Sequence, residues 1–249
     1  MSKKINILGV NFNHITMEQA IDIVIGFLNS KEKLHMIFTP NPEIVMIAQK
    51  EIKLQEILNH SDLVVPDGIG IVKAAKILKD PLTERVAGYD LVQNVFEKIS
   101  KTNHTVYFLG GAKEVADQAA KNMQEKYPGL KIIGCHDGYF SKNEEMTIIQ
   151  EINELKPDLL LVGLGAPRQE MWLYDNRKKL NAKACIGVGG SFDVMSGKVK
   201  RAPKWMIKSN LEWFYRLLVQ PTRIKRMINL PIFMLKVLVN KKKALSSRK

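Results

Sequence analysis

Short apolar runs alternate with longer amphipathic segments along most of the chain. Apolar runs that stop at glycine, proline or a polar turn predict buried strands, here over residues 5–10, 34–38, 62–65, 105–109, 131–135, 158–162 and 183–188. Apolar residues at three- and four-residue spacing predict helices over residues 17–28, 43–49, 51–58, 71–78, 113–127 and 141–155, with a further helix after residue 170. Strands that alternate with helices in this way form mostly parallel sheets covered by helices. The pattern therefore predicts an α/β fold with a Rossmann-like parallel sheet.

Polar groups follow two of the predicted strands, at the edge where open α/β sheets place their ligands. One strand runs into Thr39-Pro40-Asn41-Pro42-Glu43, whose prolines hold Thr39 and Asn41 in a stiff turn. Another runs into Pro66-Asp67-Gly68-Ile69-Gly70. Asp67 is the first candidate for a catalytic group. Because Asp also caps helices often, spacing alone leaves both roles open.

The loop that contains Arg85-Val86-Ala87-Gly88 supplies a candidate cation. Arg85 is either a solvated surface charge or a ligand for a diphosphate, since a guanidinium matches phosphate oxygens in a fixed fork.

Later strand ends carry glycines next to predicted helices, at Gly110-Gly111, at Gly163 and Gly165, and at Gly189-Gly190. Glycine lets the backbone approach a ligand, and a helix N-terminus offers free N–H groups to phosphate. A full G-x-G-x-x-G fingerprint is missing. Asp137 nevertheless lies one strand after Gly110-Gly111, where a dinucleotide fold can place the acid that binds the ribose, so an NAD-dependent oxidoreductase stays open as an alternative.

The positive charge of the chain is confined to its last fifth. Of 38 Lys and Arg and 25 Asp and Glu, residues 196–249 hold 15 basic residues and one acid, Glu212, which leaves 23 basic and 24 acidic residues in positions 1–195. This asymmetry predicts two parts, a near-neutral core over residues 1–195 and a basic appendage over residues 196–249 that meets a polyanion.

The appendage mixes aromatic and aliphatic residues with its cations, and it offers no stretch of about 20 apolar residues that could span a bilayer. This composition favours helices that lie in the interface of an anionic membrane, with nucleic-acid binding as the alternative. The tail over residues 241–249 is expected to be disordered. The N-terminus shows no signal peptide, and Cys135 and Cys185 read as small hydrophobes of a reducing cytoplasm.

Five motifs occur together and in order: residues 39–43, 66–70, 85–88, 163–170 and 188–193. With them the chain resembles the WecG/TagA/CpsF family of bacterial glycosyltransferases. This resemblance implies transfer of a sugar from a UDP donor to an undecaprenyl-diphosphate-linked saccharide at the cytoplasmic face of the membrane. Within the family, the chain is most similar to the N-acetylmannosaminyltransferases that make the linkage disaccharide of wall teichoic acid. That likeness implies UDP-N-acetylmannosamine as donor and lipid-linked N-acetylglucosamine as acceptor, with another UDP sugar as the alternative.

The resemblance also implies roles for single residues. Asp67 matches the general base, Arg85 a cation near the leaving diphosphate, and Gln169 a polar residue of the same pocket. Thr39 and Asn41 match residues that orient sugar hydroxyls. The nucleotide is expected at Asp193 with Gly189 and Gly190, and the diphosphate at three arginines of the appendage, Arg216, Arg223 and Arg226.

Two absences in the sequence shape the expected mechanism. Neither a D-x-D pair for a metal nor a second carboxylate near Asp67 is present in the sequence. We therefore expect a metal-independent and cofactor-free displacement with inversion, by analogy with inverting enzymes that use a carboxylate base.

The apolar surface of the appendage is also one that a second subunit could cover.

Overall fold

The computed structural model describes residues 3–32, 34–219 and 228–246. Its centre is a six-stranded sheet in the order β4-β3-β8-β7-β5-β6, and all neighbouring strands are parallel. The strands are β3 (His35–Phe38), β4 (Leu63–Val64), β5 (Thr105–Gly110), β6 (Lys131–His136), β7 (Leu159–Gly163) and β8 (Ala184–Gly187). The predicted α/β fold with a parallel sheet is confirmed.

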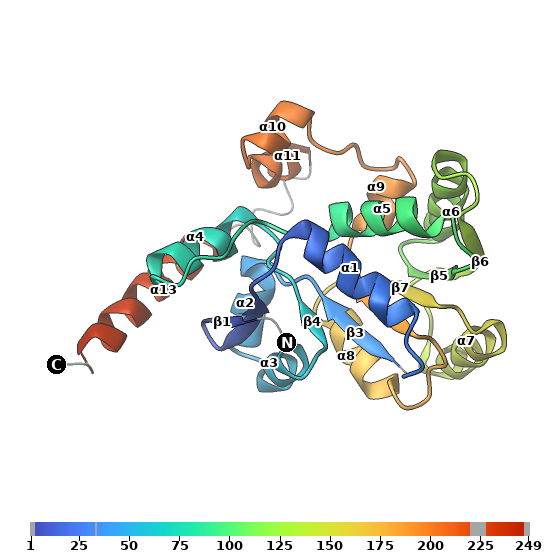
Figure 1. Ribbon diagram of the computed structural model, residues 1–249, viewed down its shortest axis with the longest axis horizontal. Helices are drawn as coiled ribbons and strands as arrows, with labels where there is room; N and C mark the ends of the chain where they lie inside the picture. Colours follow the sequence, from blue (N-terminus) through green and yellow to red (C-terminus); the bar gives the residue numbers. More distant parts are fainter. Residues whose placement is uncertain (1–2, 33, 220–227, 247–249) are drawn as a thin grey trace.

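Helices cover both faces of this sheet (Figure 1). One face packs against α1 (Met17–Leu28), α5 (Gly88–Ile99), α6 (Val115–Lys126) and α9 (Ser191–Met195). The other packs against α2 (Pro42–Ala48), α3 (Ile52–Asn59), α4 (Ile69–Ile77), α7 (Lys142–Leu155), α8 (Arg168–Asn176) and α13 (Asn229–Ser246). Successive strand residues point to opposite faces, so Val106 and Phe108 join one core cluster while Tyr107 and Leu109 join the other.

The register of the central strands places three loops that carry predicted site residues side by side. Strand β3 lies between β4 and β8, with Phe38 opposite Val64 and Ile37 opposite Ile186. Because the strands are parallel, the loops that follow them leave the sheet at one edge. The segments that begin at Thr39, Pro66 and Val188 are therefore neighbours in space.

The N-terminal strand prediction is wrong. Residues 5–10 do not form one strand but a hairpin of β1 (Lys4–Ile7) and β2 (Val10–Asn13), which pair antiparallel. Leu8 and Gly9, with φ of 48° and 84°, form the turn, as expected for a two-residue hairpin loop that needs positive φ.

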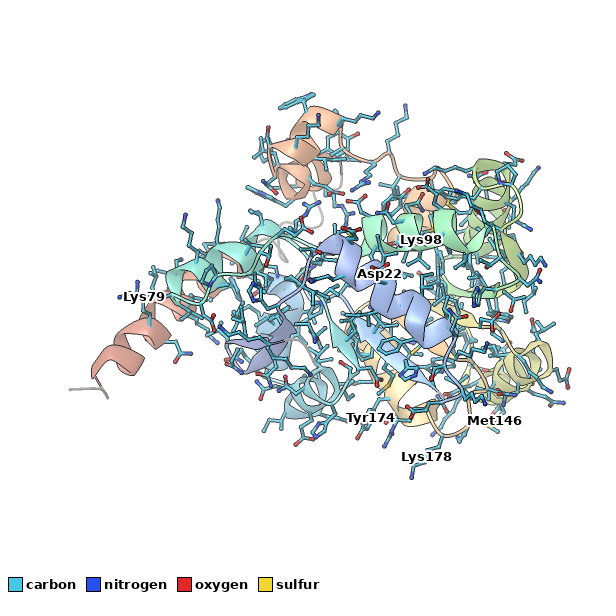
Figure 2. The ribbon with its side chains drawn as sticks, viewed as in Figure 1. Asp22, Lys79, Lys98, Met146, Tyr174 and Lys178 are labelled. Atoms are coloured by element: carbon cyan, nitrogen blue, oxygen red, sulfur yellow. The ribbon has the colours of Figure 1, made fainter. Side chains whose placement is uncertain are left out.

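Helix α5 follows the loop that contains Arg85, and it is not among the helices predicted from the sequence. Its apolar residues Leu91, Val92, Val95, Phe96 and Ile99 are fully buried and do have helical spacing. Figure 2 shows Asp22 on α1 and Lys98 on α5 facing each other, and their charged groups are 2.8 Å apart. This helix brings Gly88 and Asp90 to the same edge of the sheet as the loops that begin at Thr39, Pro66 and Val188.

The appendage contains α10 (Lys204–Lys208), α11 (Glu212–Val219) and α13. Helix α13 runs beside α4 (Figure 1), and its Phe233 and Val237 are fully buried in a core cluster of the sheet. The tail prediction is wrong for residues 241–246, which continue α13, because lysine, alanine and leucine are strong helix formers. Within the described ranges, every helix is too short or too polar to cross a membrane. The division at residue 195 stays a prediction.

Candidate active site

Asp67 stands in the loop between β4 and α4, at the carboxyl edge of the sheet. Gly68 occupies the N-cap position of α4, with φ of 91°, so Asp67 lies one residue outside it. The Asp67 carboxylate instead accepts a hydrogen bond from the backbone N–H of Gly88, the first residue of α5. The start of α5 thus contacts the carboxylate, and Asp67 as a residue is half-buried.

The surroundings of Asp67 raise its pKa. Burial is the largest cause and raises the pKa of the carboxyl above its ordinary value, while the guanidinium groups of Arg85 and Arg216 lower it. The carboxylate of Glu212 raises it further, and the Gly88 N–H lowers it. The net effect is a stronger proton acceptor than an exposed aspartate, which suits a general base.

Two adjoining pockets share Asp67. The residues common to both walls are Asn41, Glu43, Asp67, Glu212 and Arg216. One pocket, here called the apolar pocket, is otherwise lined by Pro42, Gly68, Ile69, Gly70, Trp213 and Leu230, and by the polar residues Arg85 and Asn210. The second, here called the polar pocket, is lined mainly by Thr39, Gly88, Gln169, Gly187, Gly189, Gly190, Ser191 and Arg201.

Thr39 and Asn41 line the polar pocket and also shape their own loop. The Thr39 hydroxyl donates to the carbonyl oxygen of Gly187 at 3.5 Å, a long contact. Oδ1 of Asn41 accepts from the Ile44 N–H at 3.0 Å and caps α2, with Pro42 at its first turn. The turn role and the pocket position therefore coexist in the same residues.

Gln169 reaches the polar pocket, yet its amide is held inside the protein. Its side chain is only 3% exposed. Its Oε1 accepts from the Gly189 N–H at 2.9 Å, and its Nε2 donates to Oε1 of Glu170 at 2.8 Å. Burial raises the pKa of Glu170, whose Oε2 has no hydrogen-bond partner among the described residues. The pair braces the Gly189 loop against α8.

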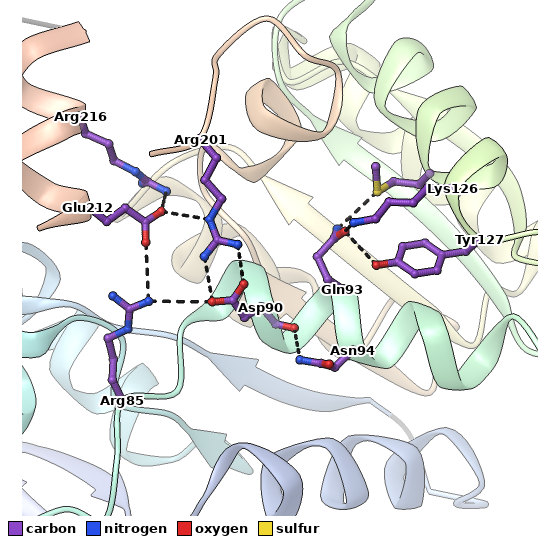
Figure 3. A network of polar contacts seen from close by, with 10 residues as sticks. Arg85, Asp90, Gln93, Asn94, Lys126, Tyr127, Arg201, Glu212 and Arg216 are labelled. Carbon is purple, nitrogen blue, oxygen red and sulfur yellow. Dashed lines mark hydrogen bonds and ion pairs between the residues drawn. The ribbon is translucent and has the colours of Figure 1, made fainter. Parts of the chain in front are cut away.

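An arginine cluster links the core to the appendage (Figure 3). It consists of Arg85, Asp90, Arg201, Glu212 and Arg216. Arg201 forms a fork with the Asp90 carboxylate at 2.6 and 2.8 Å, and Arg85 lies 3.9 Å from the same carboxylate. Arg85, Arg201 and Arg216 lie 3.6, 3.4 and 3.3 Å from the Glu212 oxygens. Three cations therefore meet where the two pockets adjoin.

The remaining predicted residues fall in different places. Gly189 and Gly190 line the polar pocket. Asp193, in α9, lines a smaller neighbouring cavity together with Gly190 and Arg201. Arg216 lines both pockets, whereas Arg223 and Arg226 lie outside the described residues.

The glycines that kept an NAD site open have a structural explanation. A Cβ on Gly110 would lie 2.5 Å from the backbone of Gly163, so glycine is needed for β5 and β7 to approach. Asp137 accepts from the N–H of Tyr139 at 2.7 Å, a local turn. Gly110, Gly111, Gly163 and Asp137 are absent from the described linings of the polar and apolar pockets.

Sequence reasoning missed Glu43, Asp90, Arg201 and Glu212 as site residues. In the sequence Arg201 is one of 15 basic residues of the appendage, and Asp90 lies on α5, which is not among the helices predicted from the sequence. Glu212 did carry a signal, because it is the single acid among 15 basic residues and is nevertheless buried.

Metal-ligating side chains do not gather in the described parts of the chain. In those ranges, His, Cys, Asp and Glu form no group of three or more that could hold a metal ion. Metal independence itself stays a prediction that needs a biochemical test.

Comparison with known proteins identifies the family. The model of the glycosyl transferase WecG/TagA/CpsF family matches residues 5–247. An N-acetylglucosaminyldiphosphoundecaprenol N-acetyl-beta-D-mannosaminyltransferase of Staphylococcus aureus strain MRSA252 is 39% identical over 242 residues, which cover 96% of this chain and 94% of the relative. The protein of the same name from strain NCTC 8325 / PS 47 is 38% identical over the same shares. The chain belongs to the WecG/TagA/CpsF family and is a glycosyltransferase.

Proposed function

We propose that this member of the family transfers N-acetylmannosamine from UDP-N-acetylmannosamine to the N-acetylglucosamine of undecaprenyl-diphosphate-N-acetylglucosamine. The relatives are named as transferases of N-acetylmannosamine to N-acetylglucosaminyldiphosphoundecaprenol, and the similarity extends over nearly the whole of both chains. The observation that carries the proposal is the position of Asp67 in the wall common to two chemically different pockets. A base at such a boundary can act between two bound substrates.

The lining of each pocket suits one substrate. In the polar pocket, backbone groups of Gly187, Gly189 and Gly190 and the guanidinium of Arg201 surround the cavity, and such groups bind phosphates. We assign this pocket to the UDP sugar. In the apolar pocket, Trp213 and Leu230 offer surface for a lipid-linked saccharide, because aromatic and aliphatic side chains bind apolar ligand surface. We assign it to the acceptor.

In the proposed reaction, Asp67 accepts the proton of the attacking hydroxyl of the acceptor. The hydroxyl oxygen forms a bond to the anomeric carbon, and the bond from that carbon to the UDP oxygen breaks. UDP leaves with the electron pair, and its charge is stabilised by Arg85 and by the other cations of the arginine cluster. Attack opposite to the leaving group inverts the configuration at the anomeric carbon.

Glu43 and Glu212 line both pockets as Asp67 does. Three guanidinium groups already contact the Glu212 carboxylate, so Glu43 is the carboxylate to compare with Asp67. We therefore compare Asp67→Asn with Glu43→Gln in transfer assays. If Asp67 is the base, Asp67→Asn lowers kcat by about 10²- to 10⁴-fold with little change in donor affinity, and Glu43→Gln loses far less. The reverse order of the two losses would assign the base to Glu43. Circular dichroism confirms that each variant is folded.

A donor screen tests the overall function. Purified protein is mixed with lipid-linked N-acetylglucosamine and several UDP sugars, in the presence and absence of EDTA. Transfer from UDP-N-acetylmannosamine alone, undiminished by EDTA, is the expected result. Transfer from a different UDP sugar would keep the family chemistry and change the donor. NAD-dependent turnover, or tight DNA binding without transfer, would replace the proposal with one of the two alternatives.

The appendage gives this enzyme its proposed place at the cytoplasmic face of the membrane. Leu218 on α11 and Leu235 and Val239 on α13 are 60%, 62% and 54% exposed, amid the cations of residues 196–249. Exposed apolar groups beside cations bind anionic lipid surfaces. We propose that these helices dock on the membrane that carries the acceptor.

Vesicle flotation tests the membrane role. The protein is expected to float with phosphatidylglycerol vesicles and much less with phosphatidylcholine vesicles, and Leu235→Glu with Val239→Glu should abolish binding. Ile52→Glu is the matched control, since Ile52 is a similarly exposed aliphatic residue, on α3 of the core. Unchanged binding of the double variant would refute the assignment, and a loss of self-association instead would point to a second copy of the chain as the occupant.

A further inference from the structure

Three guanidinium groups converge on one carboxylate, that of Glu212 (Figure 3). Arg85 comes from the loop before α5, Arg201 from the segment before α10, and Arg216 from α11. Only Glu212 in residues 196–249 is acidic, and it lines both pockets. Because three cations meet at this single carboxylate, another anion could bind at the same position.

The contacts to Glu212 are loose for charged groups. They measure 3.3 to 3.6 Å, whereas well-formed hydrogen bonds between such groups measure about 2.7–2.9 Å. Arg201 provides the comparison within the same cluster, because its fork with Asp90 measures 2.6 and 2.8 Å. In this arrangement the two oxygens of Glu212 make no close fork with any of the three guanidinium groups. A larger anion with more oxygens could contact all three.

The charge of the cluster favours such an exchange. Three guanidinium groups and two carboxylates leave one net positive charge, and withdrawal of Glu212 would leave two. A diphosphate carries two or more negative charges, so it gains more Coulomb energy from the three arginines than the single charge of Glu212 does. Glu212 begins α11, and a rotation of its side chain would vacate the position without moving the helix.

We infer that Arg201 binds the diphosphate of the nucleotide sugar and that Glu212 holds that position until the diphosphate displaces it. Arg201 is oriented in advance by the Asp90 fork and by the ring of Tyr89, whose centroid lies 4.6 Å from its Cζ. A cation that is already held loses little conformational freedom when the ligand arrives. The nature of the ligand rests on the proposed function, whereas the exchange of anions does not.

Calorimetric titration of the full chain with pyrophosphate and with UDP tests the inference. Glu212→Gln keeps the shape of the side chain and removes the competing charge, so we expect both ligands to bind roughly fivefold more tightly. Arg201→Gln should weaken both by about tenfold or more. Asp175→Asn is the matched control, because Asp175 pairs with Lys53 on the exposed surface at 2.9 Å, and it should bind like the wild type.

A purely structural role for the cluster gives a different result. Glu212→Gln would then bind either ligand no more tightly than the wild type, and Arg201→Gln would bind as the wild type does; either outcome overturns the inference. If Glu212→Gln does not fold, Glu212→Asp keeps a charge at the start of α11 but shortens its reach, and it too should tighten binding. Pyrophosphate that follows these expectations while UDP does not bind would refute the proposed donor and leave the anion exchange standing.

Discussion

Phe233→Ala tests whether the packing of α13 on the sheet stabilises the core of the enzyme. Phe233 is fully buried against the sheet, although it lies in the basic appendage, far from the core in sequence. Burial of such a side chain contributes roughly 2–3 kcal/mol, and the cavity left by its loss raises the cost of Phe→Ala in a core to about 3–5 kcal/mol. Val237 is the other fully buried anchor of this helix and contributes about 1.5–2 kcal/mol. Phe233 is therefore expected to make the larger of these two contributions to the docking of α13.

The assay separates local release of α13 from global unfolding. Urea unfolding should show a loss of about 3 kcal/mol, unless the helix detaches first, in which case its amides exchange hydrogen faster while the core transition moves less. Leu235→Ala is the control, since Leu235 is 62% exposed on the same helix and should cost under about 0.5 kcal/mol. Equal effects of the two substitutions in both measurements would refute the packing of α13 on the core. Because Leu230 lines the apolar pocket, release should also raise KM for the acceptor and leave UDP affinity unchanged.

Three further predictions follow from buried or shielded titratable groups. The pKa of Asp67 in the folded chain lies above its ordinary 3.8. Between the unfolded and the folded pKa the folded chain keeps a proton that the unfolded chain has lost, so stability falls as pH rises through this interval. Thermal melts across pH should show that Asp67→Asn abolishes this fall and melts higher than the wild type at pH 7. Glu170→Gln should keep the acceptor for Gln169 and near-normal transfer, whereas Glu170→Leu should cost about 1–3 kcal/mol of stability and lower kcat/KM; equal losses in the two variants would contradict the bracing role. Burial and the Asp117 carboxylate raise the pKa of Cys135 to about 12, so its alkylation by iodoacetamide at pH 7 should be roughly 1000-fold slower than that of a free cysteine, and faster in Asp117→Asn.

The sequence predicted those parts of the site that follow buried strands. Thr39 and Asp67 come directly after β3 and β4, and parallel strands deliver such residues to one edge whatever their side chains are. The hairpin of residues 4–13 escaped prediction because an apolar run gives no sign that Leu8 adopts positive φ. The spacing of apolar residues predicts the type of a segment, but it does not show where the backbone reverses direction within that segment.

The arginine cluster could not be read from the sequence for a different reason. Arg85, Asp90, Arg201 and Glu212 belong to three segments, and their partnership depends on how the appendage folds back on the core. Helix periodicity within α11 does relate Glu212 to Arg216, four residues later. It gives no information on which residues of another segment they meet. The lone acid in a basic segment was the one usable sign.

The candidate site is therefore built from both the core and the appendage, so the appendage contributes residues to the pockets in addition to its proposed membrane contact. The core provides Asp67, the Gly88 N–H that holds it, and the glycine loops of the polar pocket. The appendage provides Glu212, Arg216 and Trp213, which line the apolar pocket, and each lies on the same short helix as the exposed Leu218. In the membrane docking that we propose, a surface that binds Leu218 acts on α11 as a whole, so it also acts on the carboxylate that we place at the diphosphate position. Anionic vesicles should therefore tighten UDP binding to the wild type and have much less effect on Glu212→Gln; an equal gain in both would separate membrane docking from the arginine cluster.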